Sequence, residues 1–214
     1  MTGIESKSSA RKRCGALRRQ MGEAEREGLN KALAAKLLTL PGSVLGVYQP
    51  IASEPDPMPA VRAWLEAGPN RQLALPWCMD RAASSMIYRT WRLGAPLMPD
   101  AAGIPSAEGE AVVPDILLIP CLGWSDANRR LGYGGGYFDR YISGLEGRAR
   151  PVLVGAAFYA CRVDDALFDE LDLPLDFIVT ERGRKNEKDP LGGIEPQAGL
   201  LGKHRRGLTA SDAS

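Results

Sequence analysis

Arg130-Leu-Gly-Tyr-Gly-Gly-Gly-Tyr-Phe-Asp-Arg140 is the stretch that decides how this chain folds, and four of its residues are glycines within five positions. An apolar run at residues 116–119 comes before it, and residues 137–142 have the pattern of a helix start. A buried strand, a glycine-rich loop and a helix in this order are typical of α/β proteins, which bind ligands beyond the carboxyl ends of their strands.

The composition of this loop indicates an anion site. Glycine tolerates positive φ, so successive backbone N–H groups can converge on one anion, and a following helix start adds partial positive charge. The guanidinium groups of Arg130 and Arg140 suit phosphate oxygens. Asp139 fits if a divalent cation lies between its carboxylate and the phosphates. These features predict a Mg-nucleotide site; the alternative is an ordinary glycine-rich turn with solvated charges.

The rest of the chain alternates between helical and strand patterns. We expect a helix over 10–40, broken near Met21-Gly22, then a strand at 44–48 and a helix at 58–67. Further strands are expected at 72–75, 85–91, 113–120 and 151–158, with a loop at 93–114 and a short helix or turn at 163–171. This order predicts an α/β sandwich with a mainly parallel sheet. We expect a flexible N-terminus at 1–9, one domain at 10–181 and a mostly disordered tail at 182–214.

Composition excludes several functional classes. The chain has 214 residues, 44% hydrophobic and 25% charged, with a net charge of +1, so nothing in it favours nucleic acid or membranes as partners. Its four cysteines form no CxxC pair and its one histidine is His204, so no zinc site is predicted. We expect free thiols in a cytoplasmic protein, since no signal peptide or membrane-spanning run is apparent.

The decapeptide from Arg130 to Asp139 resembles the signature of the 5-formyltetrahydrofolate cyclo-ligases, also called 5,10-methenyltetrahydrofolate synthetases. It departs only at Phe138, where tyrosine is usual, and the resemblance extends from about residue 11 to residue 181. It implies a three-layer Rossmann-like sandwich and a monomer. It also implies a reaction in which 5-formyltetrahydrofolate and ATP, with Mg²⁺, give 5,10-methenyltetrahydrofolate, ADP and phosphate.

The resemblance also implies roles for individual residues. Arg130 and Tyr137 would be catalytic, and Asp139 and Asp172 would bind the metal. Gln49, Glu54, Tyr133 and Tyr137 would contact the reduced folate. The implied ATP contacts are Arg18, Arg130, Leu131, Gly132, Tyr133, Gly134, Gly135, Gly136, Tyr137 and Phe138.

The softer motifs leave alternatives open. In the family a K-x-x-L-R motif near the N-terminus contacts ATP; Leu17-Arg18 matches its end, but Cys14 stands at the lysine position, so Lys12 or Arg13 could substitute. Glu54 and Asp172 could each be a structural cap.

Leu171 replaces a histidine that is usual in the family. These departures support one rival hypothesis, a catalytically silent nucleotide- or folate-binding paralogue. A second rival is another α/β enzyme with a phosphate ligand, such as a sugar-phosphate isomerase or a CoA transferase.

Overall fold

The computed structural model describes residues 5–145, 149–170 and 172–184. The expected tail is described only at 182–184; the remainder, His204 included, lies outside the described residues, as does Leu171. The expected flexible N-terminus is described from residue 5, and a helix begins there at Lys7, because the Ser6 side chain accepts a hydrogen bond from the N–H of Ser9 and caps it.

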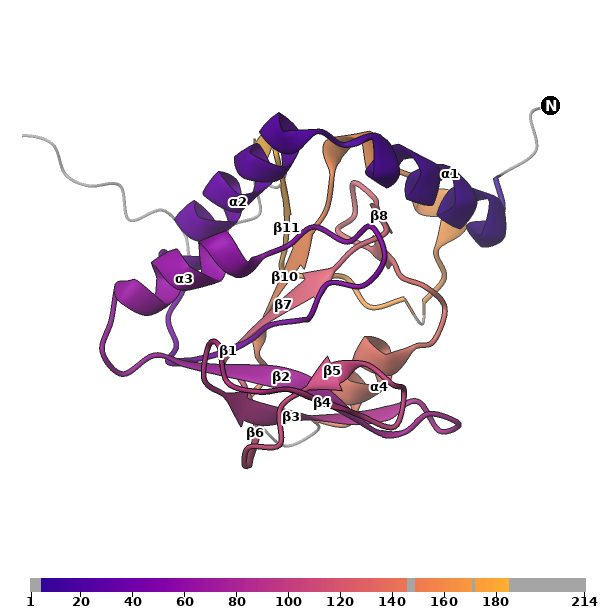
Figure 1. Ribbon diagram of the computed structural model, residues 1–214. Coiled ribbons are helices and arrows are strands. Elements are labelled where there is room, and N and C mark those ends of the chain that lie inside the picture. Colours follow the sequence, from indigo (N-terminus) through magenta and orange to yellow (C-terminus); the bar gives the residue numbers. More distant parts are fainter. Residues whose placement is uncertain (1–4, 146–148, 171, 185–214) are drawn as a thin grey trace, which may run out of the picture.

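An eight-stranded sheet forms the centre of the molecule, in the order β12-β11-β10-β7-β1-β2-β3-β6 (Figure 1). The five strands from β11 to β2 pair in parallel, and the outer pairings β12–β11, β2–β3 and β3–β6 are antiparallel. The bounds are β1 Val44–Gly46, β2 Gln72–Asp80, β3 Ser85–Trp91, β6 Ala111–Val112, β7 Ile116–Pro120, β10 Val152–Ala156, β11 Phe177–Thr180 and β12 Gly183–Arg184. The predicted α/β fold with a mainly parallel sheet is confirmed.

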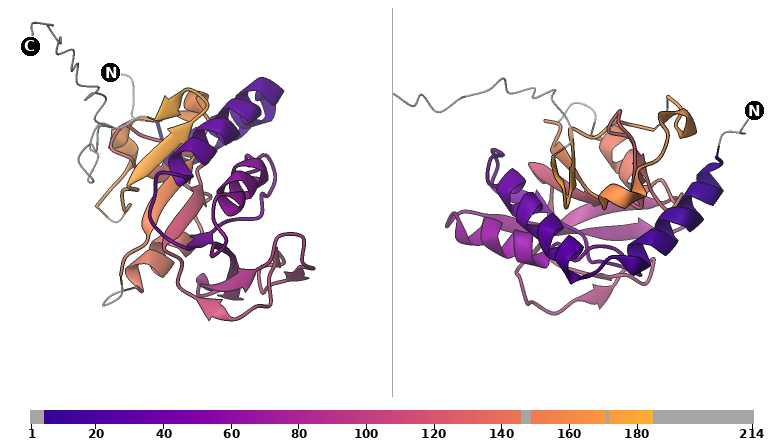
Figure 2. Two further views of the ribbon diagram at one scale, coloured as in Figure 1. Left: turned by 90° about the vertical axis from the view of Figure 1, so that its left-hand side faces the viewer. Right: turned by 90° about the horizontal axis from the view of Figure 1, so that it is seen from above.

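Helices cover both faces of the sheet and make the three layers. One face packs against α1 (Lys7–Gln20), α2 (Glu23–Leu37) and α3 (Met58–Glu66), and Figure 2 shows α1 and α2 following one side of the sheet. The other face packs against α4 (Tyr137–Ser143). Strand β7 serves both layers, since Leu118 lies in the first core and Leu117 in the second. A continuous apolar run is what a strand buried on two faces requires.

The predicted break in the N-terminal helix is confirmed. Helix α1 ends at Gln20 and α2 begins at Glu23, with Gly22 as its N-cap residue. The side chain of Glu25 accepts a hydrogen bond from the N–H of Gly22 at 3.0 Å, which satisfies a backbone donor at the start of α2. The predicted spacing of Leu29, Leu33 and Leu37 places all three in the core.

The structure departs from the sequence prediction where short strands pair locally. Residues 93–114, expected as loop, contain β4 (Met98–Pro99), β5 (Pro105–Ser106) and β6. Strand β2 continues to Asp80, beyond the predicted end, because β3 pairs with it over this length. Past residue 181, β12 adds a further antiparallel strand to β11. Propensity alone gives little signal for pairs of this length.

A second small sheet leads into the glycine-rich loop. Strands β8 (Gly123–Trp124) and β9 (Arg130–Leu131) form it, and Leu131 pairs with Gly123. Two short 3-10 helices, η1 (Tyr159–Cys161) and η2 (Asp165–Leu167), follow β10. The four cysteines are free and buried, as expected. Within the described part of the chain, every helix is too short or too polar to cross a membrane.

Candidate functional site

A pocket of about 650 Å³ lies at the carboxyl ends of the parallel strands, where Gln49 follows β1 and Pro120 ends β7. Nearly all of the site residues predicted from the sequence line it, although they come from three distant segments of the chain. They are Gln49, Glu54, Arg130, Leu131, Gly132, Tyr133, Gly134, Gly135, Gly136, Tyr137, Phe138, Asp139 and Asp172. Arg18 is the one predicted residue that is not among the described lining residues.

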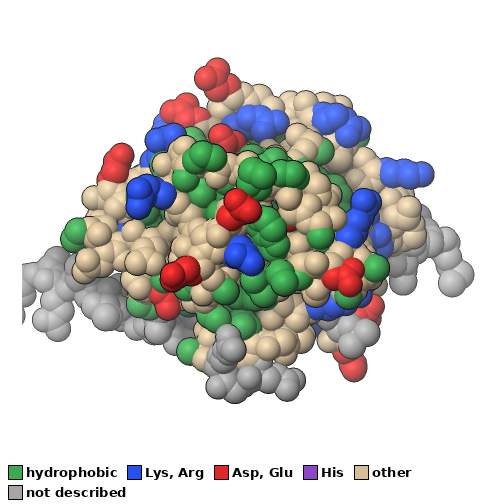
Figure 3. Space-filling view, turned by 60° about the horizontal axis from the view of Figure 1, so that its bottom comes forward, with side chains coloured by type: hydrophobic (Ala, Val, Ile, Leu, Met, Phe, Trp, Pro, Cys, Tyr) green, Lys and Arg blue, Asp and Glu red, His purple; other side chains and the backbone are tan. Residues whose placement is uncertain are grey.

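The pocket has an apolar wall and a basic wall. The apolar wall includes Cys78, Met86 and Ile104, which come from β2, β3 and the loop between β4 and β5. In Figure 3 hydrophobic side chains gather on the face of the molecule that is turned forward. The basic wall includes Lys7 and Arg11 of α1. Such a site suits a ligand with a flat ring at one end and anionic groups at the other.

The glycine loop adopts a backbone that other residues would strain. Gly134 has a φ of +94° and Gly136 a φ of +69°, and Gly136 is the N-cap residue of α4. Two guanidinium groups hold the loop: Arg11 Nε donates to the carbonyl oxygen of Gly132 at 2.8 Å, and Arg140 Nη1 donates to that of Gly135 at 2.7 Å. These two hydrogen bonds tie carbonyl groups of the loop to side chains of α1 and α4.

Asp139 is paired with Arg130 across the loop. Arg130 Nη2 donates to Asp139 Oδ2 at 2.8 Å, and the Arg130 side chain is only 9% exposed. A guanidinium shielded from water in this way is a strong partner for anionic oxygen atoms.

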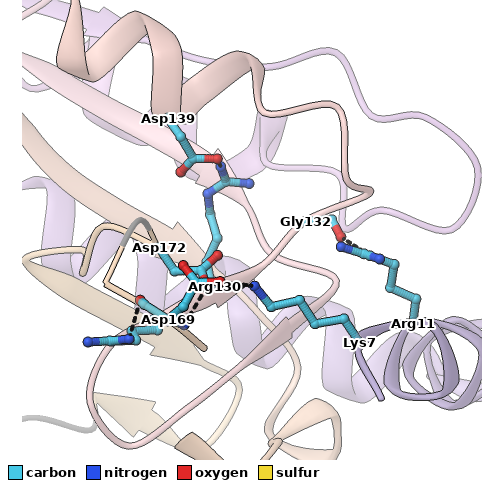
Figure 4. A network of polar contacts seen from close by, with 8 residues as sticks. Lys7, Arg11, Arg130, Gly132, Asp139, Asp169 and Asp172 are labelled. Carbon is cyan, nitrogen blue, oxygen red and sulfur yellow. Dashed lines mark hydrogen bonds and ion pairs between the residues drawn. The ribbon is translucent and has the colours of Figure 1, made fainter. Parts of the chain in front are cut away.

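Asp172 is paired with a different cation, Lys7 (Figure 4). Lys7 Nζ lies 2.6 Å from Asp172 Oδ2 and 3.3 Å from Asp169 Oδ2. The hydrogen bond to Asp172 is the main reason that the pKa of Lys7 is raised. Asp172 Oδ2 also accepts the N–H of Asp169 at 2.9 Å, so this carboxylate does act as a local cap as well as facing the pocket.

The described carboxylates of this pocket do not enclose a metal ion by themselves. The described residues contain no group of three or more His, Cys, Asp or Glu side chains that could enclose an ion. Asp139 and Asp172 nevertheless line one pocket beside basic groups. Mg²⁺ is commonly held by one or two carboxylates, with nucleotide phosphates and water completing its shell. The donor set therefore suits a metal that arrives with a nucleotide.

Glu54 is buried at the pocket and also caps its own loop. Its Oε2 accepts the N–H of Ile51 at 2.9 Å, and Tyr48 donates to the carbonyl oxygen of Pro55 at 2.8 Å, which holds residues 49–57 in place. Burial raises the pKa of Glu54, and the hydrogen bond from Ile51 and the charge of Arg18 oppose that rise. The Glu54 carboxyl group is therefore a buried hydrogen-bond acceptor at the pocket.

Two tyrosines of the glycine loop face the pocket differently. Tyr137 is close to the apolar wall, with its hydroxyl 3.8 Å from Cys78 Sγ. Desolvation raises the pKa of Tyr137, so its hydroxyl stays a hydrogen-bond donor at neutral pH. Tyr133 is 51% exposed, and its hydroxyl accepts a hydrogen bond from Arg18.

Arg18 lies behind the pocket wall. It is 1% exposed, and its Nε donates to Ser53 Oγ at 3.3 Å while its Nη2 donates to Tyr133. The sequence predicts Arg18 as an ATP contact; in the structure the Nε and Nη2 atoms of its guanidinium are directed to protein groups.

Sequence reasoning missed Lys7 and Arg11, which supply the basic wall. Neither open alternative for the lysine lies at the pocket: Lys12 is exposed, and Arg13 pairs with Glu5 at 2.9 Å. Lys7-Ser-Ser-Ala-Arg11 has the lysine-to-arginine spacing of K-x-x-L-R, seven residues before Cys14 and Arg18. Alanine in place of the motif's leucine concealed the match. Seven residues are close to two helical turns, so both registers place their residues on similar faces of α1.

Comparisons with known proteins all point to one family. The model of the 5-formyltetrahydrofolate cyclo-ligase family matches residues 3–181. The 5-formyltetrahydrofolate cyclo-ligase of Mycolicibacterium smegmatis is 30% identical over 167 residues, which are 72% of this chain and 80% of that protein. The Escherichia coli K12 enzyme of that name is 24% identical over 174 residues, 76% of this chain and 93% of the enzyme. The solution structure of Aquifex aeolicus 5,10-methenyltetrahydrofolate synthetase matches with a TM-score of 0.68 at 26% identity, covering 93% of this chain and 99% of that one.

Proposed function

This chain belongs to the 5-formyltetrahydrofolate cyclo-ligase family, and we propose that it converts 5-formyltetrahydrofolate to 5,10-methenyltetrahydrofolate with ATP and Mg²⁺, releasing ADP and phosphate. One observation carries the proposal: Gln49, Glu54, the glycine loop and Asp172, far apart in sequence, line one pocket with an apolar and a basic wall. We also propose that it acts as a cytoplasmic monomer whose catalytic unit is the single domain predicted at 10–181, extended to Lys7 at the start of α1. Its four buried free cysteines are typical of a reducing compartment.

The chemistry needs positioning more than covalent catalysis. A formamide oxygen is a poor leaving group, so it first attacks the γ-phosphorus of ATP and displaces ADP. N10 of the folate then attacks the activated formyl carbon, loses its proton, and phosphate departs with the former formyl oxygen. Ring closure benefits from an intramolecular nucleophile that is already oriented. The protein has to align the γ-phosphate with the formyl oxygen and offset the charge that develops.

The basic wall and the glycine loop would hold the nucleotide. Backbone N–H groups from Leu131 to Phe138 would face the phosphates, and Lys7 and Arg11 would add charge. Arg130, nearly buried, would stabilise the charge of the transferring phosphoryl group, which is the catalytic role we assign to it. Asp139 and Asp172 would hold Mg²⁺. When bound, this ion would neutralise phosphate charge and orient the phosphates.

The apolar wall would hold the reduced folate. Glu54 would accept hydrogen bonds from the N–H groups of the ring, and Gln49 of the same loop could donate or accept. Tyr137, whose hydroxyl remains protonated, would donate to the formyl group, and Tyr133 would cover the junction of the two ligands. Met86 and Ile104 would keep water from the reacting atoms.

One assay tests the function against its rivals. Purified protein is mixed with 5-formyltetrahydrofolate, ATP and Mg²⁺, and the methenyl chromophore is followed by absorbance, with omission of ATP as the control. We expect ATP-dependent product. Binding of both ligands without product would instead support the silent paralogue. The silent-paralogue hypothesis rested in part on the missing lysine of the N-terminal motif. Lys7 lines the pocket and supplies a lysine there, which weakens that hypothesis.

A further inference from the structure

Arg18 is an unusual side chain for its place in the molecule. Among the described residues, Arg18 and Glu54 are the two charged residues that are buried, and Arg18 is 1% exposed. Removing a guanidinium from water is unfavourable unless its donors and its charge are satisfied. Here the Nη1 atom of Arg18 has no partner among the described groups, so the site tolerates an incompletely satisfied cation. Such a residue calls for a functional reason.

The partners of Arg18 indicate that reason, because they belong to two different loops. Its Nε donates to Ser53 Oγ at 3.3 Å, next to Glu54 in the loop that follows β1. Its Nη2 donates to the hydroxyl of Tyr133 in the glycine loop. One planar guanidinium therefore connects the loop proposed for the reduced folate with the loop proposed for the nucleotide.

Each connection reaches a pocket residue. Tyr133 lines the pocket and is 51% exposed, and its ring centroid lies 5.6 Å from the Arg18 guanidinium carbon, so the buried cation anchors an otherwise exposed residue. On the other side, the positive charge of Arg18 favours the ionised form of Glu54 against the effect of burial. The same helix also holds the glycine loop through Arg11.

We propose that Arg18 is a positioning residue that couples the two substrate subsites of this pocket. It holds Tyr133 and the Ser53–Glu54 segment at a set separation, so a ligand in one subsite fixes the loop that the second ligand must meet. The second ligand then loses less conformational freedom on binding, which makes the coupling favourable in both directions. This inference builds on the proposed function, which supplies the two ligands.

Binding measurements test the coupling without turnover. Affinity for a non-hydrolysable ATP analogue with Mg²⁺ is measured by calorimetry with and without 5-formyltetrahydrofolate, and then with the order of ligands reversed. We expect each ligand to tighten the other by about 5-fold or more in the native protein, a typical size for coupled sites. Arg18→Gln should bring this factor close to one.

Further variants separate positioning from folding. Tyr133→Phe removes only the hydroxyl of an exposed residue, so it should fold normally and lose the coupling. Combining Arg18→Gln with Tyr133→Phe should reduce the coupling factor no further than either single substitution. Arg18→Lys should not restore the coupling, because an ammonium lacks the planar fork that reaches both loops. Arg19→Gln, an exposed charge on the same helix, is the matched control and should retain it.

Three results would overturn the inference. They are native protein without coupling, coupling that survives Tyr133→Phe, and an Arg18→Gln defect confined to ATP affinity with Tyr133→Phe unaffected. The last result would mean that Arg18 binds the nucleotide directly. Absence of methenyl product, in contrast, would refute the proposed function alone, because the coupling is read from binding of the two ligands.

Discussion

The ammonium of Lys7, in the first turn of α1, lies 2.6 Å from a carboxylate oxygen of Asp172, 165 residues further along the chain. Lys7, proposed to bind ATP, thus forms an ion pair with Asp172, proposed to bind the metal. Arg130 and Asp139 form a second such pair, at 2.8 Å. Arrival of a metal-bound nucleotide would offer the carboxylates a cation and the basic groups an anion. Both ion pairs can therefore be replaced by contacts with the metal and the phosphates, and no charged side chain is left unpaired.

The first prediction concerns Lys7. Replacement by glutamine in Lys7→Gln should raise the ATP KM by roughly 10-fold or more, since a hydrogen bond to a charged group contributes about 1.5–3 kcal/mol. The KM for the reduced folate should change little. Lys12→Gln, an exposed charge on the same helix, is the control and should leave both constants unchanged. If only Lys12→Gln raised the ATP KM, then Lys12, and not Lys7, would be the lysine that contacts ATP.

Cys14 gives the complementary prediction. It is fully buried, with its Sγ 3.6 Å from the carbonyl oxygen of Cys161, so a lysine there would put an ammonium in the core. Cys14→Lys should lower the free energy of unfolding by several kcal/mol, roughly the effective penalty for a buried unpaired ion, and should not improve ATP use. Urea denaturation and ATP kinetics measure the two effects. A stable variant with a lower ATP KM would support the lysine position first read from the sequence.

Gly134 tests the backbone of the anion site. Its φ of +94° is unfavourable for alanine, and a Cβ atom would lie 3.4 Å from Arg11 Nη2. Gly134→Ala should therefore weaken ATP binding as the loop shifts. The matched control is Gly94→Ala, with a φ of +83° and open space around it, which carries similar strain away from the pocket. Calorimetric ATP affinity that falls equally in both variants would mean that strain alone, and not the anion site, is responsible.

The two carboxylates are predicted to differ in importance for the metal. Asp139→Asn should lower turnover strongly and raise the Mg²⁺ concentration required, because it also leaves the nearly buried Arg130 without its partner. Asp172→Asn should act in the same direction but more weakly, by about 10-fold, because we expect Asp172 to reach the ion through a bound water. Mg²⁺ titrations of initial rate measure both. Glu170→Gln, an exposed acidic residue outside the pocket lining, should behave like the native enzyme. If it responds like Asp172→Asn, the effect is one of general surface charge.

Glu54 should connect stability with pH. Burial raises its pKa, so the folded protein keeps a proton on this carboxyl group at pH values where the unfolded chain has lost it. The contribution of Glu54 to the free energy of unfolding therefore falls as pH rises above about 4 and through the raised pKa of the folded state. Glu54→Gln removes this dependence, so the stability of native protein relative to the variant should decrease from pH 4 toward neutrality.

Kinetics of the same variant separate a binding role from a structural one. Glu54→Gln should raise the folate KM and leave ATP binding intact. Glutamine can still accept the N–H of Ile51, so the loop should keep its conformation. Reduced stability with normal kinetics would instead assign Glu54 to its capping role alone.

The sequence by itself determined the parts of this protein that depend on local pattern. Apolar spacing at Leu29, Leu33 and Leu37 predicted the buried face of α2, and the apolar run before the glycine loop predicted strand β7, since burial on one or two faces leaves a periodic mark. The glycine loop could also be recognised from the sequence, because its backbone has a positive φ at Gly134 and Gly136, which favours glycine there.

Only the tertiary structure decided which basic residues reach the pocket. A helix nearly repeats after seven residues, so the alignments of the lysine–arginine motif that end at Arg11 and at Arg18 look alike in sequence. In the structure Arg11 lines the pocket, whereas Arg18 is buried behind the pocket wall. The partners Lys7 and Asp172 meet because α1 packs beside the segment that follows β10, a contact with no local signature. Such pairings arise from the global packing of the chain, and a pattern of neighbouring residues does not contain them.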